Sequence, residues 1–219
     1  MYNGNEKRGK VSFCFFLIGA NDADGIMVRD RKLGELADIK ICTGSPGKTK
    51  KHGFPVRWLG CSDFLKNNMI ALDPREYTGF PAPPCLIRSG DIVVKRIAPT
   101  FVNYIDAIDG EVFAGNNLIV ITPGEEVYSR YVAMLLNEGI RSLAESDSVG
   151  AVMKSVNRTS LENFRIPCIP YEKQKLVGDL WYYGIELEKK KDRLAELETI
   201  KNNHRIKEYV ESFGGNHNG

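Results

Sequence analysis

The C-terminal stretch of this chain, from Tyr171 to about Ser212, constrains its fold more than any other feature. It contains no proline and is dense in Glu, Lys and Leu, a composition that favours one uninterrupted helix. Between Glu172 and Glu211, nine acidic residues balance nine basic ones, as on the solvated surface of an exposed helix. At about 1.5 Å per residue, the predicted helix is about 60 Å long.

An apolar stripe follows this predicted helix with the alternating four- and three-residue spacing of a coiled-coil seam. Lys190 occupies one position of the seam, so the stripe is incomplete. A helix so much longer than the domain before it cannot bury the stripe on its own core. We therefore expect a partner helix to cover the stripe residues, which are Leu176, Leu180, Tyr183, Leu187, Leu194 and Leu197.

Residues 1–170 have a different texture, with all 10 prolines of the chain. Short apolar runs separated by turn residues predict strands near 36–41, 85–88, 91–94, 111–114 and 118–122. The segment 128–144 has helical spacing, and the step Asp109-Gly110 suggests a hairpin between 104–105 and 112–113. With 219 residues, the chain is long enough for one domain and an appendage. We predict an α+β (mixed) domain of short twisted strands and a few helices, followed by the long helix.

The residues that commonly carry catalysis or bind metals are scattered along the chain. His52, His204 and His217 lie far apart, and no C-x-x-C pair is present, so we expect no catalytic constellation and no metal site. The paired acids at Glu125-Glu126 are interpreted as surface residues. The odd number of widely spaced cysteines favours a reducing cytoplasm: Cys14, Cys42, Cys61, Cys85 and Cys168.

The N-terminus offers an alternative location for the protein. Lys7, Arg8 and Lys10 precede the apolar run 11–18, a crude signal-peptide layout. A short buried strand explains the same run, and we favour the strand. No stretch approaches the roughly 20 apolar residues of a transmembrane helix.

One loop invites a phosphate-binding interpretation and does not meet its requirements. Residues 44–49 read Gly-Ser-Pro-Gly-Lys-Thr, but Cys42 stands where the pattern needs a glycine. Gly53 and Pro55 also interrupt the helix that such a loop requires. We therefore do not expect nucleotide hydrolysis.

The same loop is a candidate basic surface, because cations and aromatic side chains alternate in it without an acid. Its cations are Lys40, Lys48, Lys50, Lys51 and Arg57, interleaved with His52, Phe54 and Trp58. A solubilising loop is the alternative. Side chains that could reach a nucleic-acid groove also gather near a later strand: Arg88, Lys95, Arg96, Thr100 and Asn103.

Four segments, in order, resemble the specificity (DNA-recognition) subunits of type I restriction-modification systems. Leu33 to Lys40, leading to Gly44, looks like the entry into a target-recognition domain of that family. Residues 89–96 and 114–121 are similar to two of its strands. The passage with Gly150, 156–161 and 164–170, then Glu172, Gln174 and a long helix, resembles its transition into a conserved helix.

The resemblance implies a half-length specificity subunit, because one recognition domain and one spacer helix are present where the family has two of each. It implies a DNA-binding target-recognition domain over 1–170, and a helix over 171–212 for dimerisation and methyltransferase docking. A disordered tail would follow over 213–219. Two copies with antiparallel helices would recognise two inverted half-sites.

The partners implied by the resemblance are double-stranded DNA, an N6-adenine methyltransferase subunit that uses S-adenosylmethionine, a second copy of the chain and a motor-nuclease subunit. The chain itself would be a non-catalytic cytoplasmic subunit with no cofactor of its own, since base flipping and chemistry belong to the methyltransferase. The DNA-binding residues expected are Lys48, Lys50, Lys51, Arg57, Arg88, Lys95, Arg96, Asn103, Lys154 and Asn157.

Two alternatives remain open at this point. The chain is a coiled-coil adaptor without DNA binding, or it is the recognition-domain fragment of a larger restriction or methyltransferase enzyme.

Overall fold

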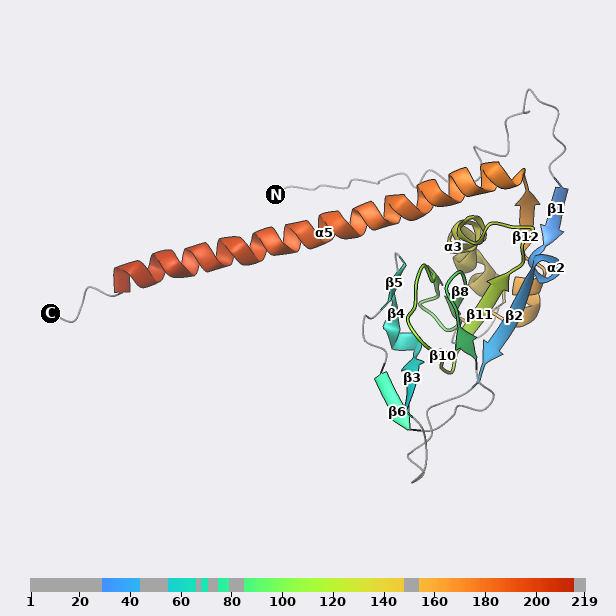
Figure 1. The fold of residues 1–219 in the computed structure, drawn as a ribbon, viewed down its shortest axis with the longest axis horizontal. Helices are drawn as coiled ribbons and strands as arrows, with labels where there is room; N and C mark the ends of the chain where they lie inside the picture. The colour runs from blue at the N-terminus through green and yellow to red at the C-terminus, as the bar shows by residue number, and fades with distance from the viewer. Residues whose placement is uncertain are drawn as a thin grey trace. The chain divides into compact units, whose positions relative to one another are not determined.

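The computed structural model describes residues 29–43, 55–65, 68–70, 75–78, 85–147 and 154–214. By its internal contacts the chain divides into two units, Met1–Gly178 and Asp179–Gly219. The first unit contains all the strands and the second is part of one helix (Figure 1). The predicted α+β (mixed) class is confirmed.

An antiparallel sheet with the strand order β2-β11-β8-β9 lies at the centre of the first unit. Its strands are β2 (Ala37–Cys42), β11 (Leu118–Pro123), β8 (Ile92–Lys95) and β9 (Phe101–Tyr104). Leu118, Ile119, Val120 and Ile121 of β11 are all buried. A strand buried on both faces reads as a continuous apolar run, and for this reason β11 was recognisable in the sequence.

A second sheet has the order β6-β3-β10-β7. It consists of β6 (Arg75–Thr78), β3 (Pro55–Leu59), β10 (Val112–Ala114) and β7 (Leu86–Ile87). A short 3-10 helix, η1 (Cys61–Asp63), leads from it to a two-stranded sheet of β4 (Phe64–Leu65) and β5 (Met69–Ile70).

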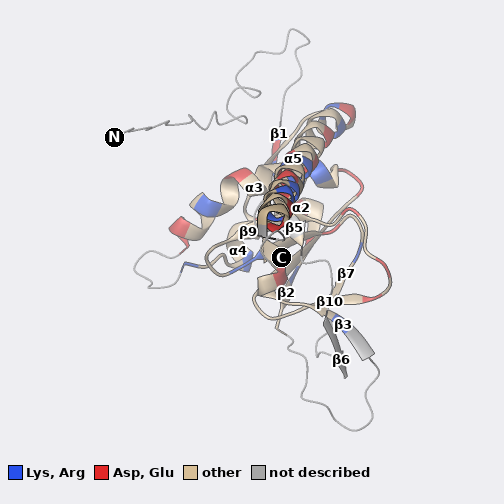
Figure 2. Ribbon diagram, turned by 90° about the vertical axis from the view of Figure 1, so that its left-hand side faces the viewer, with Lys and Arg blue, Asp and Glu red and all other residues tan. Residues whose placement is uncertain are grey.

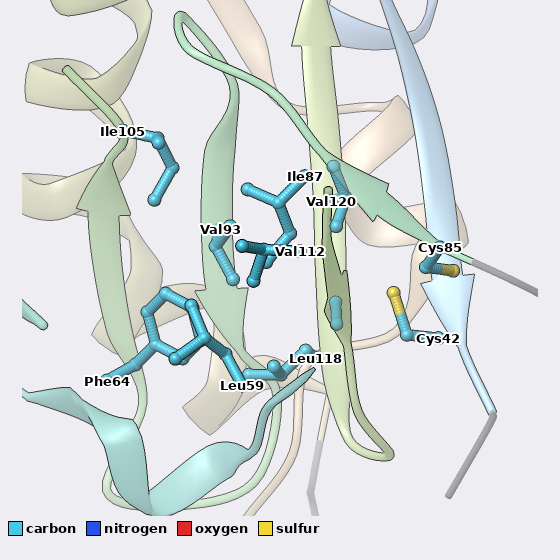
Figure 3. Packing of buried hydrophobic residues seen from close by; sticks show 11 residues of the cluster. Cys42, Leu59, Phe64, Cys85, Ile87, Val93, Ile105, Val112, Leu118 and Val120 are labelled. Atoms are coloured by element: carbon cyan, nitrogen blue, oxygen red, sulfur yellow. The ribbon is translucent and has the colours of Figure 1, made fainter. Parts of the chain in front are cut away.

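The main apolar core lies between these sheets (Figure 3). Val93 and Val120 of the first sheet point toward Ile87 and Val112 of the second. Cys42 and Cys85 are buried in the same cluster, and burial raises the pKa of the Cys42 thiol. Because the thiolate is the reactive form, both cysteines are packing residues in this fold.

Helix α3 (Ser129–Ser146) packs beside β9 of the central sheet. Its sequence has no proline, and its buried residues recur at helical spacing, among them Val132, Leu136 and Ile140. The helix predicted over 128–144 is therefore confirmed.

The predicted hairpin at Asp109-Gly110 is wrong. Gly110 has a positive φ of 68° and does form a turn. However, β9 pairs with β8, whereas β10 pairs with β3 and β7 in the other sheet. The local turn signal was real, but the core between the two sheets separates the two strands.

The described part of the domain begins and ends in the same small sheet. Strand β1 (Arg29–Lys32) pairs antiparallel with β12 (Arg165–Cys168). The short helices that adjoin them, α2 (Leu33–Leu36) and α4 (Arg158–Glu162), are in contact. Pro167 is tolerated in β12 because this strand lies at a sheet edge.

Helix α5 runs without interruption from Tyr171 to Gly214, which confirms the predicted long helix. Lys and Arg alternate with Asp and Glu along it (Figure 2). The helix includes two residues of the predicted tail, Phe213 and Gly214, and the rest of that tail lies outside the described residues. None of the described helices combines the length and apolar character that crossing a membrane requires. The apolar run 11–18 also lies outside the described residues.

Candidate nucleic-acid interface

The two predicted basic segments leave the central sheet at the same edge. Leu118 lies opposite both Cys42 and Lys95 in the strand pairing, and Lys95 lies opposite Phe101. The ends of β2 and β8 and the beginnings of β9 and β11 are therefore neighbours. The loop that carries Lys48, Lys50 and Lys51 follows β2 directly, although these three residues lie outside the described part of the chain.

Backbone pairing brings a distant segment to this edge. The amide of Val156 donates to the carbonyl of Arg96 at 3.0 Å, and the amide of Ala98 donates to the carbonyl of Lys154 at 3.0 Å. The Arg96 guanidinium adds a bond from Nε to the carbonyl of Val156 at 3.1 Å. Four predicted DNA-binding residues are thereby brought together. We call this group the basic edge: Lys95, Arg96, Lys154 and Asn157.

The cations of the basic edge are held only loosely. The Lys95 ammonium lies 5.2 Å from the centre of the Phe101 ring. Lys154 Nζ lies 3.5 Å from Glu145 Oε1, and the side chain of Lys154 is 55 % exposed. Exposed ion pairs of this kind contribute about 0–1 kcal/mol. Lys154 can therefore exchange its carboxylate partner for a phosphate at little cost.

Two further cations near the basic edge were missed by the sequence reasoning. Arg141 Nε lies 3.6 Å from the same Glu145 oxygen, and Arg158 Nε lies 2.6 Å from Glu162 Oε1. Arg158 follows Asn157 in the family-like passage, so sequence could have found it. Arg141 is brought here by the end of α3, which no local signal shows. A hollow of about 310 Å³ opens beside them, lined by Ala98, Pro99, Thr100, Phe101, Arg141, Ala144, Glu145 and Lys154.

Asn157 has a structural task in addition to its place on the basic edge. Its Oδ1 accepts a hydrogen bond from the amide of Ser160 at 2.8 Å, which caps α4. Its own amide donates to Asp147 Oδ2 at 2.9 Å. The cap orients the start of α4 and uses the carbonyl side of the Asn157 amide.

Arg57 and Arg88 do not belong to the basic edge. Arg88 stands before β8, at the end of that strand opposite Lys95, where its amide donates to Asp91 Oδ2 at 2.7 Å. The Arg57 guanidinium donates to the carbonyl of Asp109. Both arginines adjoin the loop 105–110, since Ser89 accepts a hydrogen bond from the amide of Ile108.

Asn103 cannot serve as a base-reading residue in this fold. It is completely buried, because it lies opposite Val93 in the β8–β9 pair and shares the face that enters the core. Within the described structure, neither atom of its side-chain amide has a hydrogen-bond partner. The sequence placed it correctly in a strand but gave no means of telling which face it occupies.

The apolar stripe of α5 is open to solvent in the single chain. Exposed fractions run from 46 % for Leu197 to 69 % for Leu176. A second apolar set near the end of the helix was missed by the sequence reasoning: Ile206, Tyr209, Val210 and Phe213. In the heptad spacing that places the stripe on one side, these four residues fall on the opposite side of the helix.

The described residues contain no cluster of His, Cys, Asp and Glu that could hold a metal ion. The exposed groups instead are the cations of the basic edge and the apolar stripe. A mixed domain with a basic edge, continued by a helix that exposes an apolar seam, defines a protein built for binding.

Solved structures of the same architecture come from type I restriction-modification systems. One is a chain from a structure that concerns the complex assembly and conformational transition of such a system, with a TM-score of 0.61 and 19 % identity. It is matched over 90 % of this chain and 48 % of its own length. No protein-family model matches the sequence.

Two other neighbours are specificity subunits. The HsdS subunit from Thermoanaerobacter tengcongensis has a TM-score of 0.55 and 20 % identity, covering 78 % of this chain and 39 % of that one. The S subunit from M. genitalium has a TM-score of 0.51 and 14 % identity, covering 83 % and 46 %. The chain has the fold of type I specificity subunits and spans less than half their length. The fold predicted from the resemblance is confirmed.

The burial of Asn103 generates a testable prediction about stability. The substitution Asn103→Val removes a buried amide without partners and should raise the free energy of unfolding by about 1 kcal/mol. Asn103→Asp, which is almost isosteric, should lower it because it buries a carboxylate. Denaturant titration followed by circular dichroism measures both. A clear loss of stability in Asn103→Val would mean that the amide is paired after all.

Proposed function

We propose that this chain is a half-length specificity subunit. It binds double-stranded DNA through its mixed domain and directs an N6-adenine methyltransferase to a bipartite target as a homodimer. The observation that carries the proposal is the combination of fold and length, since 90 % of the chain matches 48 % of a type I system chain. One domain and one exposed helical seam make half of a two-domain reader.

The DNA-binding part of the proposal rests on the basic edge. Lys95, Arg96 and Lys154 lie together at the point where the predicted basic loop leaves the sheet. Flexible cations at a sheet edge, next to a loop with further lysines, suit contact with phosphates. Arg88 and Arg57 lie at another end of the domain and would contact DNA only if the duplex reached both regions.

Double replacement of Lys95 and Lys154 by Ala should weaken binding to every duplex, because phosphate contacts carry no sequence information. The slope of log affinity against log salt should flatten by about 2, since each phosphate that is no longer neutralised by a lysine reduces it by about 0.9. Fluorescence anisotropy over a salt series measures this slope. The matched control is Lys201→Ala with Lys207→Ala on α5.

An unchanged slope in the Lys95 and Lys154 variant would remove the basic edge from the DNA interface. Weak, salt-independent binding by the wild-type chain would favour the adaptor alternative.

The homodimer part of the proposal rests on the exposed stripe of α5. Exposed leucines at seam spacing are unfavourable in water, and each buried side chain of this size contributes about 1.5–3 kcal/mol. A second copy supplies a matching stripe, and an antiparallel pair is closed by a two-fold axis. Lys190 weakens the seam at its middle.

Leu187→Glu should convert the dimer to a monomer by placing a carboxylate in the seam. Ala195→Glu adds the same charge outside the seam and should leave the dimer intact. Lys190→Leu should strengthen association about tenfold, which corresponds to about 1.4 kcal/mol. Sedimentation equilibrium at several concentrations measures all three. A wild-type chain that stays monomeric at high concentration would contradict the homodimer.

The methyltransferase part of the proposal follows from the division of labour in such a complex. A partner that flips an adenine out of the duplex and binds S-adenosylmethionine does the chemistry. The present chain then has only to hold that partner at the right place on DNA. We assign the complex to the cytoplasm.

Affinity purification of the tagged chain from its own cells should recover an adenine methyltransferase in equal amounts, with two copies of each. Mass spectrometry with quantified stoichiometry makes the measurement, and the Leu187→Glu variant serves as the comparison. A motor-nuclease recovered with them would extend the complex to restriction. Recovery of the chain alone would contradict the modification role.

A further inference from the structure

We infer that Gln174 and Gly178 form a rigid joint between the domain and α5, and that this joint sets how strictly the spacing between two DNA half-sites is read. The functional half of the inference rests on the proposed function. The joint itself lies within residues up to Gly178 and is argued from contacts in that unit.

Gln174 ties the first turn of α5 to two other elements. Its side chain is 3 % exposed. Oε1 accepts a hydrogen bond from the amide of Tyr128 at 3.0 Å, and Nε2 donates to the carbonyl of Ile169 at 2.8 Å. Tyr128 is the N-cap residue of α3, and Ile169 follows β12. One buried amide therefore fixes α5 to both the start of α3 and the end of β12.

Gly178 brings α5 into direct contact with the backbone of α3 one turn later. A Cβ at this position would lie 2.6 Å from the amide nitrogen of Tyr131 and 3.0 Å from the carbonyl carbon of Arg130. Both are backbone atoms, which cannot rotate away as a side chain can. Only glycine therefore permits this approach.

Two further contacts surround the joint. The hydroxyl of Tyr131 donates to the carbonyl of Pro167 at 2.8 Å, which links α3 to β12. The rings of Tyr128 and Tyr171 meet edge to face with centroids 6.0 Å apart. The start of α5 is thus held by polar bonds on one turn and by close packing on the next, so it cannot pivot without breaking both.

The rigidity matters because the helix is a lever. From Gln174 to Leu187, near the middle of the stripe, the helix rises about 20 Å. Successive base pairs of B-DNA are about 3.4 Å apart. A tilt of about 10° at one joint would therefore move a domain by one base pair, and a dimer has two joints. A loose joint could not distinguish target spacers that differ by a single pair.

A merely structural anchor would contribute stability without affecting spacing, so the test must measure spacing. Selection from random duplexes with wild-type protein would first identify the half-site. Affinities are then compared for two inverted half-sites with the preferred spacer and with spacers one pair shorter or longer. We expect wild type to prefer one spacer more than tenfold and Gln174→Ala to prefer it less than threefold.

The controls separate the joint from general damage. Lys175→Ala, an exposed neighbour on the same turn, should keep the wild-type preference. Affinity for a single half-site should be equal in all variants. If Gln174→Ala does not fold by circular dichroism, Gln174→Glu replaces it, because it keeps the acceptor for Tyr128 and loses the donor to Ile169. Full spacer discrimination in a folded Gln174 variant would overturn the inference.

A second measurement tests the joint without DNA. Spin labels are attached to cysteines introduced at Glu138 and Ala195, in a background with Cys14, Cys61 and Cys168 changed to Ser. Pulsed electron paramagnetic resonance on the monomeric Leu187→Glu chain should give a narrow distance distribution that broadens in Gln174→Ala and not in Lys175→Ala. A broad distribution in the parent chain would refute the joint, whereas a narrow one without any sequence-specific DNA binding would refute only the proposed function.

Discussion

The burial of β11 on both faces organises the rest of the domain. Because β11 pairs with β2 on one side and β8 on the other, it lies inside the sheet and cannot expose a face to water without losing its apolar contacts. Its alternate residues therefore define two packed layers. Leu118 and Val120 face the core shared with the second sheet, and Ile119 and Ile121 are fully buried as well.

This register also determines which polar residues are available for binding. The pairing that places Lys95 opposite Leu118 puts it at the sheet edge, next to the end of β2. The pairing of Asn103 with Val93 puts Asn103 into the core instead. Two polar side chains close in sequence thus have opposite fates, because side chains alternate between faces along a strand.

The start of α5 shows how an extended helix can be joined to a domain. A helix longer than its domain gains little from its own core, so the few contacts at its beginning must fix it. Gln174 and Gly178 supply them through one satisfied buried amide and one close backbone approach. Beyond them the helix exposes its apolar stripe and its interspersed charges. The domain and the stripe are the two binding surfaces on which the proposed function depends.

The sequence by itself determined the elements whose signal is local. The absence of proline and the seam spacing predicted α5, helical spacing predicted α3, and apolar runs predicted β2, β7, β8, β10 and β11. Only the tertiary structure decided which elements meet. It separated β9 and β10 into different sheets, buried Asn103, and brought Lys154 and Arg141 to Lys95 and Arg96. The physical reason is that periodicity depends on neighbours along the chain, whereas strand register and close approaches such as that of Gly178 depend on residues far apart in sequence.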